Sequence, residues 1–166
     1  MQAANRPLRE GMVVGLIGYA SVAVFYCLFD LLAARGALYT VDLLGKVVFR
    51  GLRDPGVLQG PMRLDLMAIF WYNGLHLLIA LAIGLTITSL AQQVEWHPSR
   101  ARLIQFTIMA GFLIIMLAVG LLTTPIRPLL PWWSIVAANA IAALLAAWYL
   151  LRKRPGFWRL LLPYRG

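Results

Sequence analysis

Charged residues are scarce in this sequence. Asp, Glu, Lys and Arg make up 13% of the 166 residues, whereas a soluble domain carries roughly 25%. Apolar residues make up 61%, against roughly 45–50% in soluble domains. A soluble domain of this length could not bury so large an apolar fraction. The composition therefore excludes an ordinary small soluble protein.

Cysteine is almost absent, and the motifs of common enzymes are missing. Cys27 is the only cysteine, which excludes an intrachain disulfide and a cysteine-rich metal site. The sequence has no HExxH motif, no paired carboxylates, no nucleophile elbow and no CxxCH haem-attachment motif, each of which would indicate a specific chemistry. We therefore expect no catalytic residue and no metal site, and we interpret the chain as a non-enzyme.

Apolar residues instead gather in four long blocks. Residues 66–91, 103–124 and 132–151 contain no charged residue, and residues 11–34 contain only Asp30. Each block exceeds the roughly 18 residues that make a membrane span. Because backbone polar groups must be paired within lipid, and because no barrel-like alternation occurs, the blocks predict helices. The expected fold is an all-α integral membrane protein, a single domain with four transmembrane helices and short loops.

A fifth, amphipathic helix is expected between the first two spans. Residues 41–53 have helical periodicity, with Thr40 suited to cap the beginning of the helix and Pro55-Gly56 suited to end it. A cationic amphipathic helix beside a span most often lies in the lipid interface, and packing on a partner subunit is the alternative. One face carries the charged residues Asp42, Lys46, Arg50 and Arg53.

The net charge of +9 comes from fifteen Lys and Arg against six acids. Because these cations lie at helix ends and in loops, the expected partners are anionic lipid headgroups, and no nucleic acid is expected. Nine of them lie on the side of the two termini and six on the other, which predicts cytoplasmic termini in a bacterial inner membrane. Six cations are expected at the headgroups: Lys46, Arg50, Arg53, Arg152, Lys153 and Arg154.

Polar side chains also occur inside the spans. Tyr72, Asn73 and His76 share one helix face because their spacing is i,i+3 or i,i+4. At about 1.5 Å of rise per residue, three more polar side chains lie in the same half of the bilayer: Tyr26, Asp30 and Asn139.

Three interpretations of this polar layer are open. The favoured one is a hydrogen-bonded network that fixes the register of the helices. The second is a site for a lipid-soluble quinone, carotenoid, chlorin or haem, bound through His76. The third is a proton or ion route through Asp30 and His76. A haem held by two histidines is not expected, because His97 follows the second span on the opposite side of the membrane.

Small residues on two spans predict a close helix contact. Ala80 and Gly84 continue the face of Asn73 and His76, and such residues allow another helix to approach closely. The first span offers another face suited to close contact, formed by Gly11, Gly15 and Gly18.

Together these features predict a non-catalytic small integral-membrane subunit that packs against larger subunits. A prokaryotic respiratory or photosynthetic electron-transfer complex is one setting for such a subunit. The first alternative is a pigment-, haem- or quinone-binding membrane protein with a pocket around His76. The second alternative is a small transporter or channel that works as an oligomer.

Overall fold

Four long helices dominate the computed structural model, which describes residues 2–58 and 63–154. All four are long and apolar enough to cross a membrane, and the described residues contain no strand. The expected all-α membrane fold is therefore confirmed. The elements are α1 (Gln2–Leu32), α2 (Tyr39–Phe49), α3 (Pro55–Leu58), α4 (Leu66–Trp96), η1 (Pro98–Arg100), α5 (Ala101–Leu122), η2 (Thr124–Ile126) and α6 (Trp132–Lys153).

The two longest helices, α1 and α4, extend beyond the charge-free blocks. Each contains 31 residues, which corresponds to about 46 Å, whereas the hydrocarbon core of a bilayer is about 30 Å thick. The predicted first span began at residue 11 and ended at residue 34, but α1 starts at Gln2 and ends at Leu32. Both helices are therefore longer than the lipid core, and their ends can extend beyond it.

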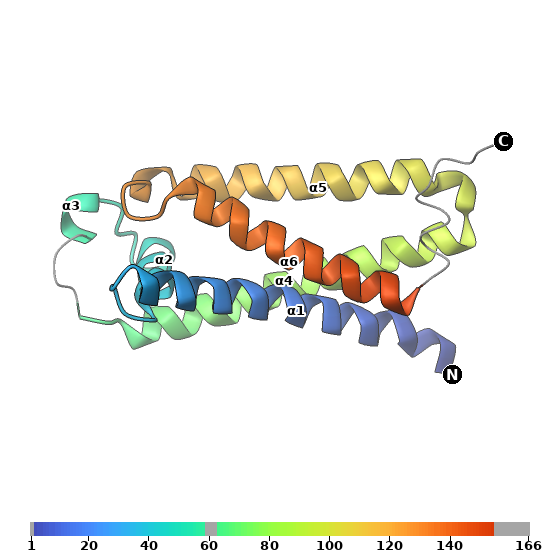
Figure 1. The fold of residues 1–166 in the computed structure, drawn as a ribbon, viewed down its shortest axis with the longest axis horizontal. Helices are drawn as coiled ribbons and strands as arrows, with labels where there is room; N and C mark the ends of the chain where they lie inside the picture. Colours follow the sequence, from blue (N-terminus) through green and yellow to red (C-terminus); the bar gives the residue numbers. More distant parts are fainter. Residues whose placement is uncertain (1, 59–62, 155–166) are drawn as a thin grey trace.

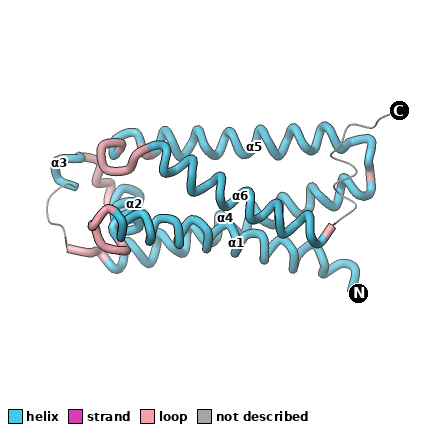
Figure 2. Tube along the Cα trace, in the orientation of Figure 1, coloured by secondary structure: helices cyan, strands magenta, loops and turns pink. Residues whose placement is uncertain are grey.

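The helices pack unevenly. α1 lies along α4 and also packs on α6, while α5 packs only sparsely on α4 and α6 (Figure 1). The loops are confined to the two ends of the bundle (Figure 2). The main apolar core lies at the end that contains α2, and its members are Leu43, Leu44, Val47, Leu58, Met116, Ile126, Leu129, Leu130 and Ile135.

Small residues form the contact between α1 and α4. A Cβ atom built on Gly84 would lie 2.4 Å from the carbonyl oxygen of Gly11 and 2.4 Å from the amide nitrogen of Gly15. A Cβ atom on Gly15 would lie 2.7 Å from the carbonyl oxygen of Ala80. The structure thus joins four of the five small residues that the sequence suggested for packing. Gly18 is different, because a Cβ atom there meets nothing within 4 Å.

The amphipathic helix differs from the prediction in its bounds. It spans Tyr39–Phe49 instead of residues 41–53, and Thr40 lies inside its first turn, while Leu38 is the N-cap residue. The helix ends early because Gly51 adopts a left-handed conformation with φ +66°, which favours glycine. Pro55, expected to end this helix, instead begins the short helix α3.

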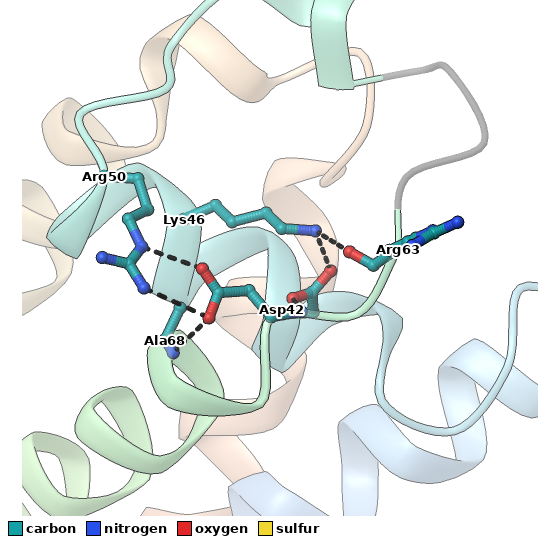
Figure 3. A network of polar contacts seen from close by, with 6 residues as sticks. Asp42, Lys46, Arg50, Arg63 and Ala68 are labelled. Atoms are coloured by element: carbon teal, nitrogen blue, oxygen red, sulfur yellow. Dashed lines mark hydrogen bonds and ion pairs between the residues drawn. The ribbon is translucent and has the colours of Figure 1, made fainter.

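Two residues of the charged face of α2, Asp42 and Lys46, are buried instead of exposed to lipid headgroups. The side chains of Asp42 and Lys46 are 9% and 6% exposed and lie 2.5 Å apart at their nearest N and O atoms. Lys46 also donates to the carbonyl oxygen of Arg63 at 2.9 Å (Figure 3). The expectation that Lys46 binds headgroups is therefore wrong, because its charge is compensated within the fold.

Arg154 is a second correction of this kind. Its guanidinium is 4% exposed and lies 2.7 Å from a carboxylate oxygen of Glu10 on α1. It also donates to Glu95 of α4 at 2.8 Å. Arg154 therefore ties α1, α4 and α6 together at one end of the bundle and is not available to lipid. The other four cations expected at the headgroups have exposed side chains: Arg50, Arg53, Arg152 and Lys153.

Candidate functional site

A cavity of about 150 Å³ lies where the polar faces of α1 and α4 meet the turn before α2. Five of the six polar residues suggested by the sequence line this cavity: Tyr26, Asp30, Tyr72, Asn73 and His76. Asn139 does not line it, and its side-chain amide donates to the carbonyl oxygen of Ile135 on its own helix at 2.8 Å. Nine lining residues were not among the sequence-based candidates, and three of these carry an oxygen or sulfur atom in the side chain: Tyr19, Cys27 and Thr40.

The arrangement of residues along the two helices explains why a cavity forms. Tyr19 and Asp30 both line the cavity, and they are eleven residues apart on α1, which corresponds to about 17 Å along the helix axis. The glycines of the crossing hold α1 and α4 close together on one side of Tyr19. Beyond the crossing, the tyrosine side chains are too large for the helices to stay in the same close contact. The cavity occupies the wider part of this helix pair.

The end of the cavity near the crossing is organised around two side chains, Asn73 and His76. The hydroxyl of Tyr19 donates to Oδ1 of Asn73 at 3.0 Å, and the amide of Asn73 donates to the carbonyl oxygen of Ile69 at 2.9 Å. The His76 ring lies 5.5 Å from the Tyr19 ring and 6.1 Å from the Tyr72 ring, with the latter planes 24° apart. Asn73 is thus fully engaged, whereas Nε2 of His76 is buried and has no hydrogen-bond partner among residues 2–58 and 63–154.

The other end of the cavity is closed by Asp30 and the start of α2. The carboxylate of Asp30 accepts hydrogen bonds from the backbone N–H and the hydroxyl of Thr40, both at 2.7 Å. Asp30 is only 1% exposed, and the N-terminal end of a helix stabilises a negative charge. This intramembrane acid therefore caps the first turn of α2 from a distance of ten residues along the chain. Tyr26 lies between the two ends, with its hydroxyl 3.5 Å from the Ser134 hydroxyl of α6.

A separate cluster of charges fixes the beginning of α4 outside the membrane span. Asp65 accepts two hydrogen bonds from Arg50, at 2.8 and 3.3 Å, and one from the backbone N–H of Ala68 at 3.0 Å (Figure 3). The hydrogen bond from Arg50 is the main reason why the pKa of Asp65 falls to about 2, and the backbone N–H of Ala68 lowers it further. Asp42 joins this cluster because it accepts from the backbone N–H of Asp65 at 2.9 Å. The cluster therefore joins α2 to the N-terminal turn of α4 and is structural in character.

Among the residues that line the cavity, the side chains able to bind a metal ion are Cys27, Asp30 and His76. Within the described ranges, no three His, Cys, Asp or Glu side chains gather closely enough to hold a metal ion. His76 and His97 are 21 positions apart along α4 and its C-cap, or about 31 Å, so one haem could not bind both. What remains is an aromatic cavity with one unpaired imidazole nitrogen.

Comparison of this chain with protein-family models, curated proteins and solved structures finds no match. The fold itself indicates the general class of the protein. Four helices of 22–31 residues have the length and apolar composition of membrane spans. The chain is a small integral-membrane protein with four membrane-spanning helices.

Proposed function

We propose that this chain is a non-catalytic subunit that packs through α5 against the transmembrane helices of a larger membrane protein. The observation that carries the proposal is the sparse packing of α5 on its own chain. Of its 22 residues, only Ile104, Met116 and Gly120 are buried. Most of its large apolar side chains, such as Phe106 and Leu113, are more than half exposed. α5 therefore leaves most of its surface to lipid or to another protein.

The polar and small residues of α5 favour another protein over lipid. Gln105 and Thr107 are exposed, and Gly111 has open space where a Cβ atom would lie. A glycine is a poor helix former, and the packing of this chain does not require one at position 111. Small and polar residues are enriched where transmembrane helices contact each other. Thr107 and Gly111 are four residues apart and share one face, so they would form the centre of such a contact.

The proposed setting is a prokaryotic respiratory or photosynthetic electron-transfer complex in the inner membrane, with both termini cytoplasmic. Two observations support it. The Lys and Arg residues are biased towards the side of the termini, which is typical of the cytoplasmic side of bacterial membrane proteins. Within residues 2–58 and 63–154, no three His, Cys, Asp or Glu side chains could hold a metal ion together, which fits a subunit whose contribution is surface area for packing.

Native mass analysis of the full chain, extracted from its own membranes in mild detergent, tests this proposal. We expect a particle that contains larger polypeptides in addition to the 18.5 kDa chain. The variant Gly111→Leu should leave the complex, because the added side chain fills the space that a partner helix would occupy. Gly74→Leu on α4 is the matched control, because a Cβ atom at Gly74 also meets nothing within 4 Å.

Three outcomes would overturn the proposal. A particle with a mass that is a multiple of the single chain would indicate an oligomer of this protein, as expected for a small channel or transporter. A monomer in detergent and in nanodiscs would show that α5 faces lipid. Equal retention of Gly111→Leu and Gly74→Leu in the complex would place the contact on another helix.

A further inference from the structure

We propose that the cavity between α1, α4 and α2 binds a neutral, lipid-soluble molecule whose flat ring carries carbonyl oxygens, which is the chemistry of a quinone. This site does not involve α5, so it is independent of the proposed subunit contact. Four features of the cavity support this ligand: an unpaired polar group, aromatic walls, a small volume, and the lack of a lining Lys or Arg.

The unpaired polar group is Nε2 of His76. This atom is buried, and no hydrogen-bond partner reaches it within the described part of the chain. A buried polar group without a partner costs roughly 1–3 kcal/mol, and no water from the bilayer core is available to it. In the tautomer that carries its proton on Nε2, the imidazole would donate a hydrogen bond to a carbonyl oxygen. A ligand that enters the cavity would supply the missing partner.

Tyr72 offers a second donor close by. Its ring packs near that of His76, at 6.1 Å between centroids, and no hydrogen bond joins its hydroxyl to another residue of ranges 2–58 and 63–154. By contrast, the hydroxyl of Tyr19 and the amide of Asn73 are already engaged. The two unengaged groups, His76 and Tyr72, are therefore neighbours four positions apart on α4. They can donate to one ring-bearing headgroup.

The walls and the volume of the cavity favour a single flat ring. Aromatic rings of Tyr19, Tyr72 and His76 line one end, and aromatic side chains bind other rings by stacking or by edge contacts. Val22 and Leu44 contribute aliphatic wall. The volume of about 150 Å³ is below the roughly 300–1,000 Å³ of sites for drug-sized ligands. One ring fits this space with its apolar tail in lipid, whereas a haem or chlorin macrocycle requires more room.

The charges around the cavity favour a neutral ligand. No Lys or Arg lines the cavity, so an anion would find no partner. Asp30 already accepts two hydrogen bonds from Thr40 at the N-terminal turn of α2, and the positive end of that helix offsets its charge. Transfer of an ion from water into this membrane layer is costly. A neutral carbonyl-bearing ring avoids that cost and uses the donors that are present.

The test uses the full chain in nanodiscs and a benzoquinone that carries one isoprenoid unit as the probe. We expect saturable binding of one probe per chain. Tyr72→Phe removes only the hydroxyl and should weaken binding about fivefold to tenfold, and His76→Leu should weaken it at least tenfold. Asn139→Leu is the matched control, because Asn139 lies within a span but outside the cavity. Its affinity should equal that of the parent chain.

A second probe separates hydrogen bonding from simple partition into an apolar space. The corresponding isoprenoid-substituted benzene has the same shape but lacks both carbonyl oxygens, so it should bind at least tenfold more weakly. Equal binding of the two probes, or binding that does not saturate, would overturn the proposal. If His76→Leu fails to fold, Tyr72→Phe decides, since it keeps the ring and its packing. Unchanged affinity of Tyr72→Phe together with unchanged affinity of His76→Phe would also overturn it, because neither substituted ring can donate a hydrogen bond.

Discussion

The contact between α1 and α4 provides the sharpest test of the fold, through the substitution Gly84→Ala. The new Cβ atom would lie 2.4 Å from backbone atoms of Gly11 and Gly15. Ordinary van der Waals contact begins near 3.4 Å, so α1 would have to move away from α4 by about 1 Å. A gap of this size removes roughly a quarter to a half of the attraction between the atoms that it separates.

The expected loss can be estimated from this geometry. Overpacking of a close-packed contact costs about 1–3 kcal/mol, and the upper end applies because both clashing groups are backbone and cannot rotate away. Alanine recovers up to about 1 kcal/mol relative to glycine through its helix propensity. Gly84→Ala should therefore lower the free energy of unfolding by about 2 kcal/mol. The matched control Gly74→Ala gains the same propensity and meets nothing within 4 Å, so it should be neutral or more stable by up to about 1 kcal/mol.

The assay is reversible unfolding in mixed micelles with increasing denaturing detergent, followed by tryptophan fluorescence and by helical circular dichroism. The comparison of the two alanine variants removes the propensity term and leaves the steric term, about 3 kcal/mol. If Gly84→Ala and Gly74→Ala unfold at the same detergent fraction, the close approach of α1 and α4 described here is incorrect.

Three further predictions concern the charged residues. Arg154→Met should lower the free energy of unfolding by about 3–5 kcal/mol, because it breaks the buried ion pair between Arg154 and Glu10, and a second substitution, Glu10→Met, should recover part of that loss in the same assay. The pKa of Asp65 is about 2 in the folded chain, below its ordinary 3.8, so the unfolded state binds protons first and stability should fall as the pH drops from about 4 to about 2. Asp65→Asn should remove this part of the pH dependence, and an unchanged acid profile would contradict it. Asp30→Leu leaves two donors of Thr40 without their acceptor and should lower the local stability of α2 by about 1–3 kcal/mol. The expected result is faster hydrogen exchange at the start of α2, and unaltered exchange there would count against the capping role.

The sequence predicts the spans well because a charge-free run of 20 or more residues leaves few alternatives. In lipid only a helix pairs all backbone groups within one segment, so three of the four helices begin within two residues of the predicted positions. The polar residues of α4 were also placed correctly relative to each other, because helical spacing fixes which side chains share a face. Tyr19 was not among the predicted polar residues, because it lies at a different depth in the membrane from Tyr26 and Asp30. Its spacing of seven positions from Tyr26 nevertheless places the two tyrosines on the same helix face.

The role of α2 could not be read from its own residues. Local periodicity shows that a helix has an apolar side and a charged side, but it does not show what lies against either side. Asp42 and Lys46 satisfy each other within one turn, and Asp65 arrives from a distant part of the chain to complete the cluster. These tertiary contacts bury Asp42 and Lys46, which the local pattern alone placed on a surface facing lipid.

The six acidic residues of the chain all have partners within the fold. Every acid in the chain accepts a hydrogen bond or forms an ion pair within the fold, and four of them bind a Lys or Arg directly in the clusters described above. Because the acids are engaged internally, the excess positive charge is left on the surface, where anionic headgroups can neutralise it. The buried ion pairs of Asp42 with Lys46 and of Glu10 with Arg154 therefore hold the two ends of the bundle. The six acids and their donors are Glu10 with Arg154, Asp30 with Thr40, Asp42 with Lys46, Asp54 with Gly56, Asp65 with Arg50, and Glu95 with Arg154.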